Sequence, residues 1–287
     1  MGTNSVADLF LFLFLSKPKI QFKMKIVKWL YAAVVAVLIF NSCGDKPNNG
    51  ENPSTDSLAL SYSIVSTLPH NSEAYTQGLV IYNNKVLEST GQKGHSWVAE
   101  VNPGSGQHEK KITLEPRYFG EGITVLNNKM YQLTWEEKTG FIYDARTYKK
   151  LGEFKYNTPG WGLTHDNESL IMSDGTDKLY FLDTTKLQVT RTVTVTDPSG
   201  VKVKNLNELE YVDGYIFANV YETALILKID PATGKVVGRL DLSPLANEIK
   251  RMYPNTDVLN GIAYDKNSKA LLVTGKLWPK SYLLRVN

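Results

Sequence analysis

The chain of 287 residues is 42% hydrophobic and 21% charged, with a net charge of +3 at neutral pH. This is an ordinary globular composition, and the length allows one large all-β domain or two smaller domains. Lysines in the first 42 residues carry most of the excess positive charge. The rest of the chain is nearly neutral, which gives no reason to expect a nucleic acid as a partner. Tyr, Thr, Val and Gly are plentiful and amphipathic helical patterns are hard to find, which favours strands.

Residues 1–43 have the pattern of an export signal. A basic run at residues 24–28 precedes an apolar run at residues 29–40, and Cys43 follows. The apolar run is short for a spanning helix, so the pattern predicts a signal that ends at a lipidated Cys43. It also predicts a bacterial cell-envelope lipoprotein in the periplasm or at the outer membrane. Because residues 1–23 lie upstream of a complete signal, Met24 is a candidate start beside Met1. The alternative to this signal is an uncleaved anchor with an incidental cysteine. With a single cysteine, no intramolecular disulfide is possible.

The segment after the cysteine has a different composition. Residues 44–57 are rich in Asn, Pro, Gly, Glu and Ser, which predicts a disordered tether. Residues 58–287 then form the expected folded domain.

One hairpin pattern repeats through this domain. In the copy YFGEGITVLNNKMYQLTW, at residues 118–135, two alternating strands flank an Asn-Asn turn. Related hairpins follow at intervals of roughly 40 to 50 residues, the period of four-stranded propeller blades. The five copies begin at Gln77, Glu121, Trp161, Asn207 and Asn260. A second hairpin follows each copy except the last.

The fifth copy lacks one strand at the end of the chain. Only residues 282–286 remain to follow its hairpin, whereas residues 58–68 alternate and have no hairpin partner of their own. We therefore expect this N-terminal strand to close the last blade and to remove the exposed sheet edges. The predicted fold is an all-β, five-bladed β-propeller of four-stranded antiparallel blades.

Equivalent positions of such a repeat converge near the central axis. We expect the five starting residues near this axis, together with the residues at the ends of the second strands. In blades two to five, the latter residues are Trp135, Asp174, Tyr221 and Lys276. These residues differ from blade to blade, as a single asymmetric pocket requires. Burial of Glu121 and Lys276 without a function is costly. The alternatives are channel amides that bond one another and water, tryptophans that pack in the core, and a Glu121–Lys276 salt bridge.

Several spaced segments also carry a family resemblance. YTQGL (75–79), ESTG (88–91), FGEGIT (119–124), GWGLT (160–164), MSDG (172–175), LNELEY (206–211), LNGIAY (259–264) and TGKLWP (274–279) resemble signature segments of plant and bacterial glutaminyl-peptide cyclotransferases. The resemblance covers about residues 60–287. It implies the five-bladed fold and the conversion of N-terminal glutamine of peptides or proteins into pyroglutamate, with loss of ammonia and no cofactor. Nothing in the sequence argues for a dimer, so a monomer is expected.

The same resemblance assigns roles to individual residues. It puts the catalytic acid at Glu121, the family's lysine at Lys276 and its asparagine at Asn207, and we expect these three to be the catalytic groups. It puts the family's glutamine at Gln77 and its pocket tryptophans at Trp135 and Trp161. The repeat positions add Asp174 and Asn260, so the expected substrate-binding set is Gln77, Trp135, Trp161, Asp174, Tyr221 and Asn260. Tyr221 stands where the family commonly has Trp, which changes the size of that wall and adds a hydroxyl.

Two other functions fit parts of the pattern. Glu121, Asp174, Asn207 and Asn260 are oxygen ligands, as a calcium-dependent propeller lactonase would need. Lys276 argues against that reading because an ammonium repels a divalent ion, and the four histidines show no ligand spacing. We therefore expect no metal, and inhibition by EDTA with rescue by calcium would favour the lactonase. The other alternative is a non-catalytic binding propeller of the envelope.

Overall fold

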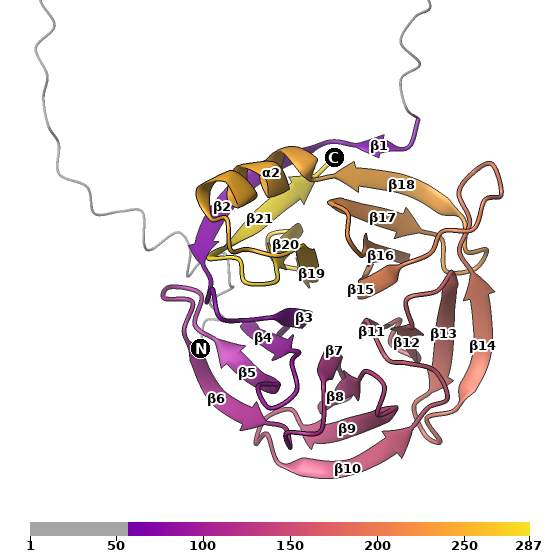
Figure 1. The fold of residues 1–287 in the computed structure, drawn as a ribbon. Helices are drawn as coiled ribbons and strands as arrows, with labels where there is room; N and C mark the ends of the chain where they lie inside the picture. Colours follow the sequence, from indigo (N-terminus) through magenta and orange to yellow (C-terminus); the bar gives the residue numbers. More distant parts are fainter. Residues whose placement is uncertain (1–56) are drawn as a thin grey trace, which may run out of the picture.

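A computed structural model describes residues 57–287 of the chain. Five sheets stand around a common axis (Figure 1). The fold is a five-bladed β-propeller, which confirms the predicted fold class. Cys43 and the signal region lie outside the described residues, as does all of the proposed tether except residue 57.

The strands of blades one to four run outward from the axis in chain order, and in blade five the N-terminal strand β2 is outermost. Blade one contains β3 (Thr76–Tyr82), β4 (Lys85–Thr90), β5 (Trp97–Val101) and β6 (His108–Thr113). Blade two contains β7 (Gly120–Leu126), β8 (Lys129–Thr134), β9 (Thr139–Asp144) and β10 (Lys150–Lys155). Blade three contains β11 (Leu163–His165), β12 (Ser169–Ser173), β13 (Lys178–Asp183) and β14 (Val189–Thr194). Blade four contains β15 (Leu206–Val212), β16 (Tyr215–Val220), β17 (Leu225–Ile229) and β18 (Val236–Asp241). Blade five contains β19 (Leu259–Asp265), β20 (Ala270–Gly275), β21 (Lys280–Val286) and β2 (Tyr62–Pro69).

The N-terminal segment closes the ring, but it does so as two strands. β2 pairs antiparallel with β21, so its closure of the last blade is confirmed. β1 (Ala59–Leu60) instead pairs parallel with β18 of blade four, and the expectation of one strand over residues 58–68 is wrong. Leu60 packs against the apolar cluster between these blades, so burial of this side chain favours the division. Figure 1 shows β1 along β18 and β2 along β21.

One helix of the described region was not predicted. α2 (Ser243–Met252) connects blade four to blade five and lies beside β21 and β2 (Figure 1). Pro244 stands in its first turn, where its missing N–H removes no helical bond. Leu245 and Ile249, one turn apart, are buried in the cluster that includes Trp278. No helix within residues 57–287 is long and apolar enough to cross a membrane.

Local turn chemistry explains why the inner hairpins form. The Asn-Asn pairs that join β3 to β4 and β7 to β8 have positive φ at both residues, between 48° and 62°. This geometry suits two-residue hairpin loops that match the twist of the strands, and Asn tolerates it better than most residues.

The innermost strands approach one another closely just below one mouth of the axis. A Cβ on Gly122 would lie 2.5 Å from the Leu163 nitrogen, so the contact between β7 and β11 requires glycine there. The corresponding positions around the ring are Gly78, Gly122, Gly162, Glu208 and Gly261. Of these five positions, only the one in blade four carries a side chain. Glu208 is fully buried, and its carboxylate accepts bonds from the Leu79 N–H at 3.1 Å and the Ile262 N–H at 2.7 Å.

Replacement of Glu208 by Ala tests this role. We expect the free energy of unfolding to fall by roughly 3 kcal/mol, because each of the two buried N–H groups left without an acceptor costs about 1–3 kcal/mol. Urea denaturation measures the change. Glu208→Gln keeps one acceptor oxygen for one of the two N–H groups and is expected to lose less than Glu208→Ala. An alanine variant as stable as the parent would contradict the role.

Candidate active site

Backbone bulges aim the site residues toward the axis. In β3, the pairing skips from Thr76 to Gly78, which leaves Gln77 as an extra residue opposite β4. β7, β15 and β19 have register shifts at the equivalent place, around Glu121, Asn207 and Asn260. Such bulges bend the strand and redirect side chains. In this way four blades turn a polar side chain toward the same region.

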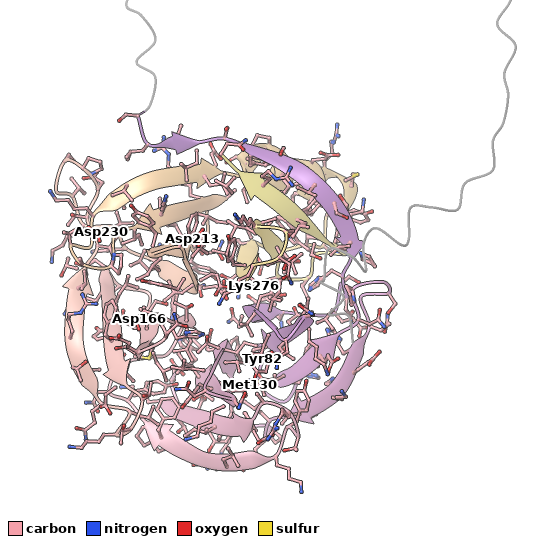
Figure 2. All side chains as sticks on the ribbon, turned by 180° about the vertical axis from the view of Figure 1, so that it is seen from behind. Tyr82, Met130, Asp166, Asp213, Asp230 and Lys276 are labelled. Atoms are coloured by element: carbon pink, nitrogen blue, oxygen red, sulfur yellow. The ribbon has the colours of Figure 1, made fainter. Side chains whose placement is uncertain are left out.

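Gln77, Glu121 and Asn207 line a cavity of about 280 Å³ at one mouth of the axis. Its walls are Tyr75, Gln77, Phe119, Glu121, Trp135, Trp161, Asn207, Tyr221 and Lys276. The cavity brings together every residue of the predicted site except Asp174 and Asn260. Figure 2 shows Lys276 near the centre of the ring, whereas Asp230 lies at its periphery.

The acid and the amine of the cavity are joined through an amide. Glu121 and Lys276 are 4% and 1% exposed, and within residues 57–287 they form no direct ion pair. Gln77 Nε2 donates to Glu121 Oε1 at 3.1 Å, and Lys276 Nζ donates to Gln77 Oε1. Glu121 and Lys276 are therefore connected through Gln77 and not by the salt bridge considered as an alternative. We call Glu121, Gln77 and Lys276 the relay.

Burial shifts both titrating groups toward neutrality. Desolvation raises the pKa of Glu121 well above its ordinary value, and Glu137 adds to the rise while Lys276 opposes it. Desolvation lowers the pKa of Lys276 to about 8, against the attraction of Glu121, Asp257 and Glu208. Burial thus moves the pKa of Glu121 upward and that of Lys276 downward, the kind of perturbation that is common at acid–base sites.

Aromatic rings form the rest of the wall. Trp161 and Tyr221 meet edge to face with ring centroids 5.5 Å apart, and Phe119 and Trp135 do so at 5.6 Å. Lys276 Nζ lies 4.5 Å from the centroid of the Tyr75 ring. Large apolar rings exclude water and strengthen the electrostatic interactions within the cavity.

Tyr75 and Phe119 were missed by the sequence reasoning. Each stands two residues before a predicted site residue, Gln77 and Glu121 respectively. An aromatic residue at the same offset in two neighbouring repeats is the signal that would have found them.

The amides of the site have different roles. Asn207 Oδ1 is buried and, in the described part of the chain, has no hydrogen-bond partner. Because Asn207 lines the cavity, this oxygen is available to a ligand. Asn260 instead donates from Nδ2 to the Thr76 carbonyl at 3.1 Å and to Gln77 Oε1 at 3.3 Å. It contacts the cavity wall rather than the cavity.

Asp174 is bonded to its own blade instead of lining the cavity. Its carboxylate accepts bonds from the Thr176 N–H at 3.0 Å and from the Tyr180 hydroxyl at 2.8 Å. Its prediction as a substrate-binding residue followed from its place in the repeat. The local Asp-Gly-Thr turn satisfies the carboxylate and turns it away from the other site residues.

The histidines are less scattered than the sequence suggested. His70 and His108 both contact Glu88 at about 3 Å. Among the residues that the structure describes, no group of three or more His, Cys, Asp or Glu is placed to hold a metal ion.

Comparison with known proteins connects this cavity to a family. The family model described as glutamine cyclotransferase matches residues 34–286. The chain belongs to the glutamine cyclotransferase family. It is similar to a glutaminyl-peptide cyclotransferase of Arabidopsis thaliana, with 37% identity over 281 residues, 95% of this chain and 85% of the relative. It also resembles the crystal structure of Myxococcus xanthus glutaminyl cyclase, with a TM-score of 0.75 and 33% identity over 81% of this chain and 99% of that chain.

The segments that resemble the glutamine cyclotransferases now have places in the fold. YTQGL and FGEGIT each contribute an aromatic residue and a polar residue to the cavity, and TGKLWP contributes Lys276. MSDG supplies Ser173, whose hydroxyl accepts from the Gly162 N–H at 2.8 Å and donates to the Asn207 carbonyl at 2.7 Å. The family's segments are therefore partly lining and partly supports for the lining.

Proposed function

We propose that this chain converts the N-terminal glutamine of peptides and proteins into pyroglutamate. The α-amine nitrogen attacks the side-chain amide carbon, the new C–N bond closes the ring, and the amide nitrogen leaves as ammonia. The observation that supports this most directly is a small aromatic-walled cavity with a buried carboxyl and a buried amine on opposite sides of one amide. Since the substrate carries its own nucleophile, proximity is largely supplied once the cavity folds the side chain back.

Glu121 is the proposed proton carrier. It accepts a proton from the attacking amine and gives one to the leaving nitrogen. Its raised pKa suits both steps, because a strongly ionised carboxylate is a poor acid. Gln77 donates to Glu121 and so fixes the carboxyl plane.

Lys276 and Asn207 are the proposed polar partners of the reacting amide. The Lys276 ammonium stabilises the negative charge that develops on the amide oxygen during attack. The free Oδ1 of Asn207 accepts an N–H of the substrate. Gln77 Nε2 already donates to Glu121, and Gln77 Oε1 accepts from Lys276 and Asn260. Gln77 therefore orients the catalytic pair rather than acting as the main oxyanion donor.

A peptide assay tests the function. A synthetic peptide with N-terminal Gln is expected to lose the mass of one ammonia and to release ammonia into solution, with or without EDTA. The same peptide with an acetylated amine has no nucleophile and is the matched control. An unmodified Gln peptide after prolonged incubation would overturn the proposal, and activity that EDTA abolishes and calcium restores would favour the lactonase.

The rate is expected to depend on pH in a bell shape. Turnover needs Glu121 ionised when the amine loses its proton, so kcat rises as pH increases through the raised pKa of Glu121. It also needs Lys276 charged, so kcat falls as pH exceeds about 8. The two limbs belong to a coupled pair of groups. Measurement of kcat at saturating peptide between pH 5 and 10 checks this, and a rate that keeps rising through pH 10 would contradict the role of Lys276.

We propose further that the enzyme is an exported, monomeric lipoprotein of the cell envelope. The basic run, the apolar run and Cys43 support a lipid anchor at Cys43, with residues 44–57 as a tether to the propeller. Mass spectrometry of the membrane-extracted protein tests the anchor, and an uncleaved, unmodified N-terminus would overturn it. Light scattering of the folded domain tests the monomer.

A further inference from the structure

A buried polar cluster lies where blade five meets blade one. At its centre is Glu88 on β4, a fully buried residue. One carboxylate oxygen accepts bonds from the Thr76 hydroxyl at 2.6 Å and from His70 Nε2 at 3.0 Å. The other oxygen accepts a bond from His108 Nε2 at 3.1 Å. Three donors on one buried carboxylate compensate for the loss of water.

Geometry sets the protonation of this cluster. His70 Nδ1 lies 2.6 Å from the Trp278 carbonyl oxygen, which can only accept, so Nδ1 carries a proton. Burial disfavours the charged imidazolium, but Glu88 and the Trp278 carbonyl raise the pKa of His70 overall. Burial likewise opposes ionisation of Glu88, yet His70, His108 and Thr76 hold the pKa of that carboxyl at about 2. His70 and Glu88 therefore form a buried ion pair.

The cluster is bonded to both segments that carry the relay of the cavity. Thr76 precedes Gln77, and its carbonyl accepts from Lys276 Nζ at 3.2 Å and from Asn260 Nδ2 at 3.1 Å. His70 binds the Trp278 carbonyl, two residues beyond Lys276, and its own N–H donates to the Pro279 carbonyl at 2.9 Å. The ion pair thus connects the start of β3 to the loop between β20 and β21.

We propose that Glu88, paired with His70, is a positioning residue for the reaction and acts through the Thr76 hydroxyl. The bond from Thr76 to Glu88 fixes the peptide unit between Thr76 and Gln77. That unit in turn presents the Thr76 carbonyl to Lys276 and holds the Gln77 amide between Lys276 and Glu121. His70 directly follows β2, the strand that closes the ring, so closure of the propeller and alignment of the lysine depend on the same pair.

A second carboxylate in blade one provides the comparison. Glu100 on β5 also has three donors, Lys85, Lys110 and Tyr148, at 3.0 to 3.2 Å. None of these residues lines the cavity. Loss of charge at Glu100 disturbs a network of similar size without touching the relay.

The sharpest test changes the hydroxyl and keeps the backbone. Thr76→Val removes the bond to Glu88 with little change in volume, and Thr76→Ser keeps a hydroxyl. The assay uses a Gln peptide, so this test rests on the proposed function. We expect Thr76→Val to lower kcat about tenfold with little change in KM, because a small displacement of reacting groups slows a reaction that depends on their positions. Thr76→Ser is expected to recover most of this loss, and Glu100→Gln to leave kcat unchanged.

The pH profile separates positioning from mere stability. The Thr76 carbonyl accepts a hydrogen bond from Lys276 and so favours the charged form of that lysine. If the carbonyl is displaced, the pKa of Lys276 falls and the alkaline limb of kcat moves to lower pH. Lower stability alone does not move that limb. If Thr76→Val does not fold, Glu88→Gln, which is nearly isosteric, is compared with Glu100→Gln in the same way. A parent that does not cyclise the peptide overturns the proposed function. If the parent is active and Thr76→Val has the same kcat and the same pH limbs as the parent, the positioning role is overturned. The same result in Glu88→Gln overturns it where Thr76→Val does not fold.

Discussion

Replacement of Glu121 by Gln is expected to lower kcat by roughly 10²-fold or more, because the variant loses the proposed acid–base group. Gln has the shape of Glu, and its Oε1 still accepts from Gln77 Nε2, so the cavity keeps its lining. A neutral amide also suits this buried position, where desolvation already raises the pKa of the carboxyl. Release of ammonia from a Gln peptide at saturating concentration measures the effect.

Glu137→Gln is the matched control for this experiment. Glu137 lies close enough to raise the pKa of Glu121, and it accepts a bond from the Phe119 N–H at 3.3 Å, but it does not line the cavity. Its replacement is expected to change kcat only slightly. Thermal unfolding confirms that both variants are folded. Parental turnover in Glu121→Gln would remove this carboxyl from the mechanism.

The fold was predictable because local signals and the repeat agree. Alternating strands, turn residues that accept positive φ and a period near that of a blade all point to one architecture. The division of the N-terminal strand at Ser61 was not predictable, because it depends on whether Leu60 packs against blade four or continues along β21. α2 was missed because it buries only Leu245 and Ile249 and is short, at ten residues, within a chain whose repeat consists of strands.

The residues of the cavity could be predicted where they occupy equivalent positions of the repeated blades. Equivalent positions converge, so Gln77, Glu121, Trp161 and Asn207 were found together. The end of the second strand supplies Trp135, Tyr221 and Lys276 in three blades and Asp174 in another. Asp174 does not line the cavity because hydrogen bonds within its own blade hold its carboxylate. Asn260 contacts Gln77 instead of the cavity because the fifth inner strand approaches Thr76 closely.

Interactions between distant buried groups could not be predicted from the pattern. Glu208 bonds to the N–H groups of Leu79 and Ile262 in two other blades. Glu88 looks like any residue of an alternating strand until His70 and His108 are placed beside it. These pairings depend on three-dimensional packing, and one sequence shows only their separate members.

Replacement of Lys276 by Met tests the other half of the proposed catalytic pair. Met keeps much of the side-chain volume and removes the charge, so the developing oxyanion loses its cation. We expect kcat to fall by roughly 10² to 10³-fold, the size of effect seen when a preorganised charge-stabilising donor is removed. Assay of the same Gln peptide across the pH range measures both the loss and the shape of the profile.

The shape of that profile distinguishes an electrostatic role from simple packing. Lys276 lowers the pKa of Glu121 through its charge, so without it the acid limb moves to higher pH. The alkaline limb near pH 8 disappears because its titrating group is gone. Lys280→Met, on the neighbouring strand and outside the cavity lining, is expected to keep both limbs. If Lys276→Met kept both the alkaline limb and the kcat of the parent, that limb would belong to another group, and the ammonium would have no part in stabilising the oxyanion.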